Sequence, residues 1–96
     1  MSRYVLLPGA RIDLREIWAF TLAEWGQVQA DRYIADIEAR FRTVAEDPKA
    51  GQACDQIRKG HFRIRVGSHF VFYRLDEGQV SIVRILHQRR DFRLHL

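Results

Sequence analysis

The chain has 96 residues, of which 47% are hydrophobic and 29% are charged, and its formal net charge is +4. This composition excludes a disordered protein, and the length is that of one domain, so we expect residues 1–96 to form a single domain. No apolar run approaches the roughly 20 residues that cross a bilayer, and the only cysteine, Cys54, excludes an internal disulfide. Without an export signal in the sequence, we expect a cytoplasmic protein with no membrane association.

The charge is divided unevenly along the chain. Residues 58–96 hold nine Lys/Arg and three Asp/Glu, a net of +6, whereas residues 1–57 have a net of −2. A basic lobe of this kind attracts an acidic partner, which can be a nucleic acid, an acidic peptide or a protein that works on nucleic acid. Charge alone does not choose among these three classes.

The first half of the chain predicts a short strand followed by two helices. Residues 4–7 are apolar and end at Pro8-Gly9, as a short opening strand would. Apolar residues then recur with helical spacing up to Gly26, which would end the helix as a left-handed C-cap. They recur again from Ala30 to Asp47-Pro48, which stops the second helix. Because so few residues separate the helices, we expect an antiparallel hairpin packed on one side of a sheet. The first stripe is Leu14, Ile17, Trp18, Thr21, Leu22 and Trp25.

The second half predicts three strands. After a polar loop at residues 49–60, the period changes to two, and turns at Gly67-Ser68 and 76–78 separate strands at about 62–66, 69–75 and 79–87. The last strand is apolar on both faces, as a central strand covered on two sides would be. Strict alternation places Arg84 on the face of Ile82 and Leu86, opposite Val83 and Ile85. The fold class is therefore α+β, and because the chain offers no further element for the second face, a partner is a candidate to cover it. The predicted core includes Ile37, Phe41, Ile82 and Ile85.

Several segments together resemble one family. The order strand, helix, helix, three-stranded meander is combined with the runs at residues 67–74 and 82–91 and a terminal His95-Leu96. The segment Leu86-His-Gln-Arg-Arg-Asp91 in and after the last strand is the most specific of these signals, and residues 13–18 and Asp47-Pro48 add weaker ones. Over nearly the whole chain, this pattern resembles the ParE branch of the RelE/ParE toxin superfamily.

The resemblance implies a toxin of a type II toxin–antitoxin system. Such a toxin would poison DNA gyrase, would be neutralised by a ParD-like antitoxin in a hetero-oligomeric complex, and would contact operator DNA only through that antitoxin. It would need no cofactor and would catalyse no covalent reaction. The alternative is the RelE branch, a ribosome-dependent mRNA endonuclease. A non-toxic nucleic-acid-binding module is a third hypothesis.

The target-binding residues are predicted to lie in the last strand and the basic segment after it. A ribonuclease needs a general base, a general acid and cations on the phosphate, and its site would combine Arg84, His87 and Arg89, with Arg63 as a further cation. His87 can equally be a strand-end histidine bonded to backbone, and Arg84 can be paired with a carboxylate. No tyrosine follows Tyr73, which favours the gyrase poison. For that reading, the predicted target-binding residues are Arg84, His87, Arg89, Arg90, Arg93 and His95.

The antitoxin is predicted to use a different set of residues. Ile12 and Phe20 point away from the main stripe of the first helix, so the core cannot bury both. They form an apolar docking surface or are two isolated exposed side chains, a common occurrence. Together with Arg63 and Arg65, they would receive an antitoxin that delivers an amphipathic helix and an acidic extended segment.

One spacing at the end of the chain resembles that of metal ligands. If the segment after the last strand is helical, His87, Asp91 and His95 share one face at intervals of four. Zinc sites require a more complete ligand set, so we predict no metal and assign Asp91 to a cap or a salt bridge.

Overall fold

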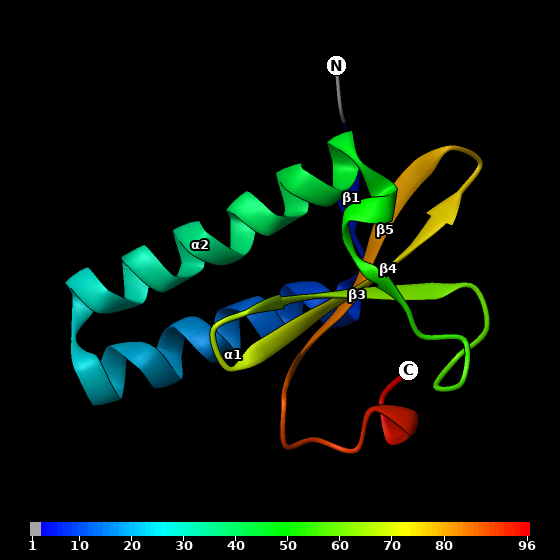
Figure 1. The fold of residues 1–96 in the computed structure, drawn as a ribbon. Helices are drawn as coiled ribbons and strands as arrows, with labels where there is room; N and C mark the ends of the chain where they lie inside the picture. The colour runs from blue at the N-terminus through cyan, green and yellow to red at the C-terminus, as the bar shows by residue number, and fades with distance from the viewer. Residues whose placement is uncertain (1–2) are drawn as a thin grey trace.

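The computed structural model describes residues 3–96 and has the predicted α+β architecture (Figure 1). Two long helices lie as an antiparallel hairpin on one face of a mixed sheet, and the C-terminal residues lie on the other side. The elements are β1 (Tyr4–Leu6), α1 (Pro8–Trp25), α2 (Gln27–Glu46), the 3-10 helix η1 (Pro48–Ala50), β2 (Gln52–Ala53), β3 (His61–Val66), β4 (His69–Asp76), β5 (Gln79–His87) and the 3-10 helix η2 (Phe92–Leu94).

The sheet has the order β1-β5-β4-β3-β2. The meander β3-β4-β5 is antiparallel, as predicted, and β1 pairs in parallel with β5 through Tyr4↔Val80 and Leu6↔Ile82. This placement of β1 makes the sheet mixed and makes β5 a central strand. The predicted loop at residues 49–60 is wrong in part, because residues 48–50 form η1 and β2 pairs with β3. Two residues are too few to show the alternation that identifies a strand in a sequence.

The helical hairpin turns at Gly26, which has φ of 89° and caps α1 by donating its N–H to Leu22 O at 3.0 Å. Glycine fits here because its positive φ carries no Cβ penalty. Across the turn, Trp18 donates its indole N–H to Asp31 Oδ1 at 3.1 Å. The predicted stripe of α1 is correct for Ile17 and Thr21 and wrong for Trp18 and Trp25, which are 38% and 73% exposed. The buried residues of α1 are Ala10, Asp13, Ile17 and Thr21.

A β-bulge in β5 corrects the predicted faces of that strand. The pairing runs Tyr73↔Ile82 and then Phe72↔Arg84, so Val83 has no partner on β4. One extra residue reverses the alternation. Ile82 and Ile85 therefore both face the helices, and the prediction that Arg84 shares a face with Ile82 is wrong.

The core lies between the helices and the sheet. The predicted core residues Ile37, Phe41, Ile82 and Ile85 are at most 2% exposed, which confirms them. This inner cluster consists of Ala10, Ile17, Ile37, Phe41, Val44, Val66, Val71, Tyr73, Val80, Ile82 and Ile85.

The outer face of the sheet is covered by the chain itself, so the prediction that the chain has no further element for this face is wrong. Its buried residues are Cys54, Phe72 and Leu86. Ile57 from the loop before β3 and Phe92 from η2 pack against them, and Phe70 and Leu96 complete this outer cluster. Cys54 lies within the predicted polar loop at residues 49–60, yet its side chain is buried, and burial raises the pKa of its thiol. Within residues 3–96, neither helix combines the length and hydrophobicity needed to cross a membrane.

Candidate target-binding and antitoxin-binding surfaces

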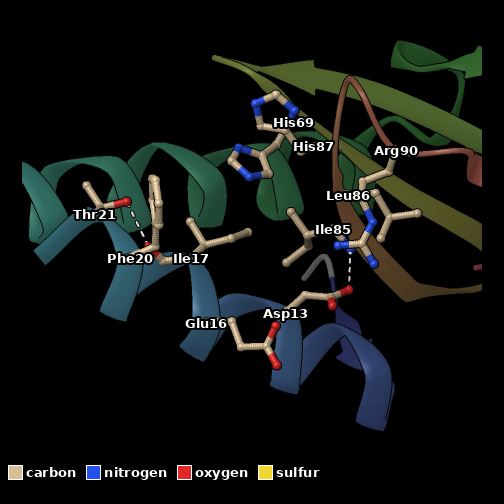
Figure 2. A pocket seen from close by; sticks show the side chains of 10 residues that line it. All are labelled: Asp13, Glu16, Ile17, Phe20, Thr21, His69, Ile85, Leu86, His87 and Arg90. Carbon is tan, nitrogen blue, oxygen red and sulfur yellow. Dashed lines mark hydrogen bonds between the residues drawn. The ribbon is translucent and has the colours of Figure 1, made fainter. Parts of the chain in front are cut away.

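A groove opens between α1 and the paired ends of β4 and β5 (Figure 2). It consists of two adjoining cavities of about 280 and 250 Å³ that share Phe20, Thr21, His69 and His87. Arg90 lines the first cavity and Trp25 lines the second. Phe20, predicted to bind the antitoxin, therefore lies beside His87 and Arg90, predicted to bind the target.

His69 and His87 line both cavities of this groove. They are paired across β4 and β5, and their rings meet edge to face with centroids 5.2 Å apart. The Tyr33 hydroxyl of α2 lies 2.6 Å from His69 Nδ1 and accepts the Ser68 N–H at 3.3 Å. Burial, followed by the neighbouring His87, lowers the pKa of His69 to about 4, so its imidazole is neutral at pH 7. Burial also raises the pKa of Tyr33.

His87 is a strand-end histidine bonded to backbone, one of its two predicted roles. Its Nδ1 accepts the N–H of Arg89 at 3.1 Å. This bond uses one ring nitrogen to hold the turn that follows β5, and the ring packs against His69.

Arg84 is paired with a carboxylate, again one of its two predicted roles. Its Nε donates to Asp13 Oδ2 at 2.7 Å and its Nη2 donates to Asp13 Oδ1 at 2.9 Å. The side chains are 25% and 8% exposed, respectively, and the bonds to Asp13 raise the pKa of Arg84. Arginine also binds a phosphate through two parallel N–H groups. In Arg84, Nε and Nη2 are already bonded in this way to the two oxygens of Asp13.

The segment after β5, residues 88–96, which we call the tail, carries the other predicted target-binding residues. Arg89, Arg90 and Arg93 are exposed, and Arg90 donates from Nε to His95 Nε2 at 3.3 Å. Asp91 caps η2 by accepting the Arg93 N–H at 3.2 Å, which confirms its predicted role as a cap. The tail thus presents three arginines, with His95 held against one of them.

The predicted antitoxin-binding residues do not share one surface. Phe20 lines the groove and is 65% exposed, and Ile12, 48% exposed, lies on α1 outside both cavities. Both side chains are off the core, as predicted. Arg63 and Arg65 lie on the outer face of the sheet, where their guanidinium carbons stand 4.6 and 5.4 Å from the centre of the Phe70 ring. Such cation–π contacts hold both cations in place.

The suggested metal geometry does not form. His87 ends β5 and η2 comprises only residues 92–94, so His87, Asp91 and His95 do not share a helical face. In the part of the chain that the structure describes, no three His, Cys, Asp or Glu side chains are grouped to hold a metal ion.

Three residues that sequence reasoning missed organise this region: Asp13, Tyr33 and His69. Asp13 had a visible signal, because it is the one charged residue in the run Ala10, Asp13, Ile17, Thr21 at helical spacing. Tyr33 and His69 had none, since only the fold brings residues 36 positions apart into contact.

Comparison with known protein families and relatives agrees with this architecture. Residues 4–92 match the family described as ParE toxin of type II toxin-antitoxin system, parDE. The chain is similar to Toxin ParE1 of Mycobacterium tuberculosis (strain ATCC 25618 / H37Rv), with 44% identity over 91 residues that cover 94% of this chain and 93% of the relative. It is also similar to Toxin ParE1 of Caulobacter vibrioides, with 40% identity, 100% of this chain and 99% of the relative covered.

Solved structures show the same fold. A chain of the chromosomal ParDE system from P. aeruginosa superposes with a TM-score of 0.78 at 17% identity, covering 91% of this chain and 96% of the other. A chain of the RelBE2 toxin–antitoxin complex from Mycobacterium tuberculosis gives 0.63 at 25% identity, covering 90% and 96%. The family match spans nearly every element described above, from β1 to the start of η2. This chain therefore belongs to the ParE toxin family of type II toxin–antitoxin systems.

Proposed function

We propose that this toxin poisons DNA gyrase in the cytoplasm, is neutralised by a ParD-like antitoxin, and acts by binding rather than by covalent catalysis. Membership of the ParE family supports the gyrase target. The observation that supports a non-catalytic mechanism is the state of Arg84, whose guanidinium is held by Asp13 at 2.7 and 2.9 Å.

The ribonuclease alternative would place Arg84, His87 and Arg89 on one phosphate. Arg84 is committed to Asp13, and one ring nitrogen of His87 is occupied by the Arg89 N–H. His69, the remaining imidazole of the groove, has its pKa lowered to about 4 by burial and so is a poor general acid near pH 7. Arg89, Arg90 and Arg93 of the tail are exposed, and they suit electrostatic binding to an acidic or DNA-bound partner.

An antitoxin partner is supported by the solved relatives, which come from ParDE and RelBE toxin–antitoxin systems. The exposed Phe20 and Trp25, 65% and 73% accessible, offer apolar contacts beside the groove, and Arg63 and Arg65 offer charge on the outer face. An antitoxin that combines an apolar helix with an acidic extension would match both features.

Gyrase supercoiling assays test the target. The purified toxin should inhibit supercoiling and leave cleaved DNA trapped on the enzyme. Replacing Arg89, Arg90 and Arg93 by alanine should weaken inhibition about tenfold or more, because three exposed cations contribute to the same encounter. The matched control replaces three exposed helical arginines, Arg15, Arg32 and Arg42, which changes the net charge equally and should leave inhibition nearly unchanged.

One outcome would contradict the gyrase proposal. A toxin that cuts ribosome-bound mRNA and leaves supercoiling untouched would replace our proposal by the ribonuclease. In that case His87→Ala should lower the cleavage rate by about 10²–10⁴, the usual contribution of a general acid or base.

Antitoxin binding is tested by salt and by charge reversal. Association with a ParD-like antitoxin should slow as the salt concentration rises, since the basic lobe steers an acidic segment. Arg63→Glu should slow it further. Insensitivity to both changes would remove the outer arginine face from the antitoxin site.

A further inference from the structure

We infer that Asp13 and Arg84 form a positioning pair that fixes the tail, residues 88–96, in the arrangement the toxin presents to its target. The inference rests on the proposed function in one respect: it takes the tail arginines to be the target-binding residues. It reassigns Arg84 from contacting the target to holding the segment that does.

Asp13 lies beside the part of β5 that β1 does not pair with. The strand β1 pairs with β5 as far as Ile82, whose carbonyl accepts the Leu7 N–H at 3.0 Å. Beyond the bulge the chain has turned into α1, and the Ile85 N–H donates to Asp13 Oδ2 at 2.9 Å instead of to a strand. The carboxylate is 8% exposed and accepts three N–H bonds in total, two of them from Arg84. These three bonds compensate the buried charge and fix the orientation of the carboxylate.

A third nitrogen of the Arg84 guanidinium bonds to the tail. While Nε and Nη2 contact Asp13, Nη1 donates to the carbonyl of His95 at 3.2 Å. The aliphatic part of the side chain is confined as well, because a Cβ added at Gly9 would stand 2.7 Å from Arg84 Cδ. Arg84 is thus in contact with α1 at both its Cδ and its guanidinium, and its Nη1 bonds to a residue 11 positions further along the chain.

Other contacts also fix the tail, among them bonds from Arg65 to the Gln88 side chain and from Arg58 to the Leu96 carbonyl. Gln88 donates its N–H to Ser68 O at 2.8 Å, at the start of the tail. Phe92 packs on the outer face with its ring centroid 4.9 Å from that of Phe72. Arg89, Arg90 and Arg93 lie between these anchors and the His95 carbonyl, so three charged side chains share one backbone conformation. Ordering such a segment before binding removes part of the entropic cost that binding would otherwise carry.

The pair would also hold α1 against β5 if the tail had no role, so the experiment must separate positioning from folding. Arg84→Lys does this, because its single ammonium nitrogen can still pair with Asp13 but cannot also replace the Nη1 bond to the His95 carbonyl. Phe92→Ala removes the aromatic contact of the tail with the outer face while leaving the Asp13–Arg84 contact intact. Asp13→Asn removes the charge of the pair, with Glu24→Gln on the exposed side of α1 as the matched control.

Each variant is examined by thermal unfolding, by limited trypsin cleavage after Arg89, Arg90 and Arg93, by antitoxin affinity and by gyrase inhibition. We expect Arg84→Lys and Phe92→Ala to remain folded and to bind antitoxin, while tail cleavage rises about tenfold and inhibition weakens about tenfold. Glu24→Gln should match the wild type in all four measurements.

Wild-type inhibition by Arg84→Lys together with rapid tail cleavage would overturn the inference, as would unchanged tail cleavage in both Arg84→Lys and Asp13→Asn. Failure of the gyrase proposal itself is distinguishable. If the wild-type protein does not inhibit gyrase, growth arrest on expression without antitoxin replaces the gyrase readout, and the same ranking of variants is expected.

Discussion

The two faces of the sheet are covered by different kinds of structure. On the inner face, regular helices bury a continuous cluster that includes Phe41, Tyr73 and Ile82, each fully buried. On the outer face, a loop and the tail cover only Cys54, Phe72 and Leu86, and the covering residues Ile57 and Phe92 are themselves partly exposed. Helices with apolar stripes can be read as core-forming elements. The short irregular tail covers its face of the sheet less completely, and its arginines Arg89, Arg90 and Arg93 stay exposed to solvent.

The largest effect is expected at the centre of the inner face. Ile82→Ala should lower the free energy of unfolding by about 2–5 kcal/mol, because it removes buried methyl groups and leaves a cavity between helices that cannot fully close. Denaturant unfolding measures this loss. A loss below about 1 kcal/mol would show that the inner face is no better packed than the outer one.

A smaller effect is expected where the inner cluster is tied to the connection before β2. The Tyr73 hydroxyl donates to Pro48 O at 2.7 Å and accepts the Gly51 N–H at 3.0 Å. Tyr73→Phe keeps the ring but leaves both backbone groups without this partner, so we expect a loss of about 1–3 kcal/mol. Amide hydrogen exchange at Gly51 should accelerate in parallel. Unchanged exchange would mean that the connection is held by other contacts.

On the outer face, Phe92→Ala should cost about 1–2 kcal/mol, less than the full burial value because Phe92 is only partly covered. Its ring contacts Phe70 and Phe72 with centroid distances of 5.7 and 4.9 Å. Urea unfolding of this variant beside Ile82→Ala gives the comparison directly. Equal losses in the two variants would contradict the difference between the faces.

The smallest effect concerns pH at the edge of the inner face. Burial lowers the pKa of His69 to about 4 in the folded protein, against an ordinary value of 6.5. The unfolded chain therefore binds a proton first as the pH falls, and the stability present above pH 6.5 is lost progressively towards pH 4. Between pH 7 and 5.5 the loss from this group should be about 1 kcal/mol.

His69→Asn removes this titration and is the control for that measurement. The groups around His69 are His87, Asp13 and the Tyr33 hydroxyl. If the pH dependence persists in His69→Asn, another group is responsible, and His87 would be examined next by the same substitution.

The sequence by itself determined the elements that follow a simple periodicity. Both helices, the turn at Gly26 and the alternation of β3 and β4 were predicted, because apolar side chains at regular spacing must face a common core. Exposure of Ile12 and Phe20 followed from the same geometry. The family could also be named from the resemblance of residues 67–74 and 82–91, and the family match confirms it.

The tertiary structure alone decided what depends on contacts between distant segments. The bulge at Val83 reverses the faces of β5, and no local pattern announces an unpaired residue within an apolar run. Asp13 and Arg84 are 71 residues apart, so their pairing could be offered only as one role for Arg84, without its partner. Likewise, the tail covers the outer face because β5 ends beside it. Periodicity reports which side of an element is buried, whereas the fold decides what buries it.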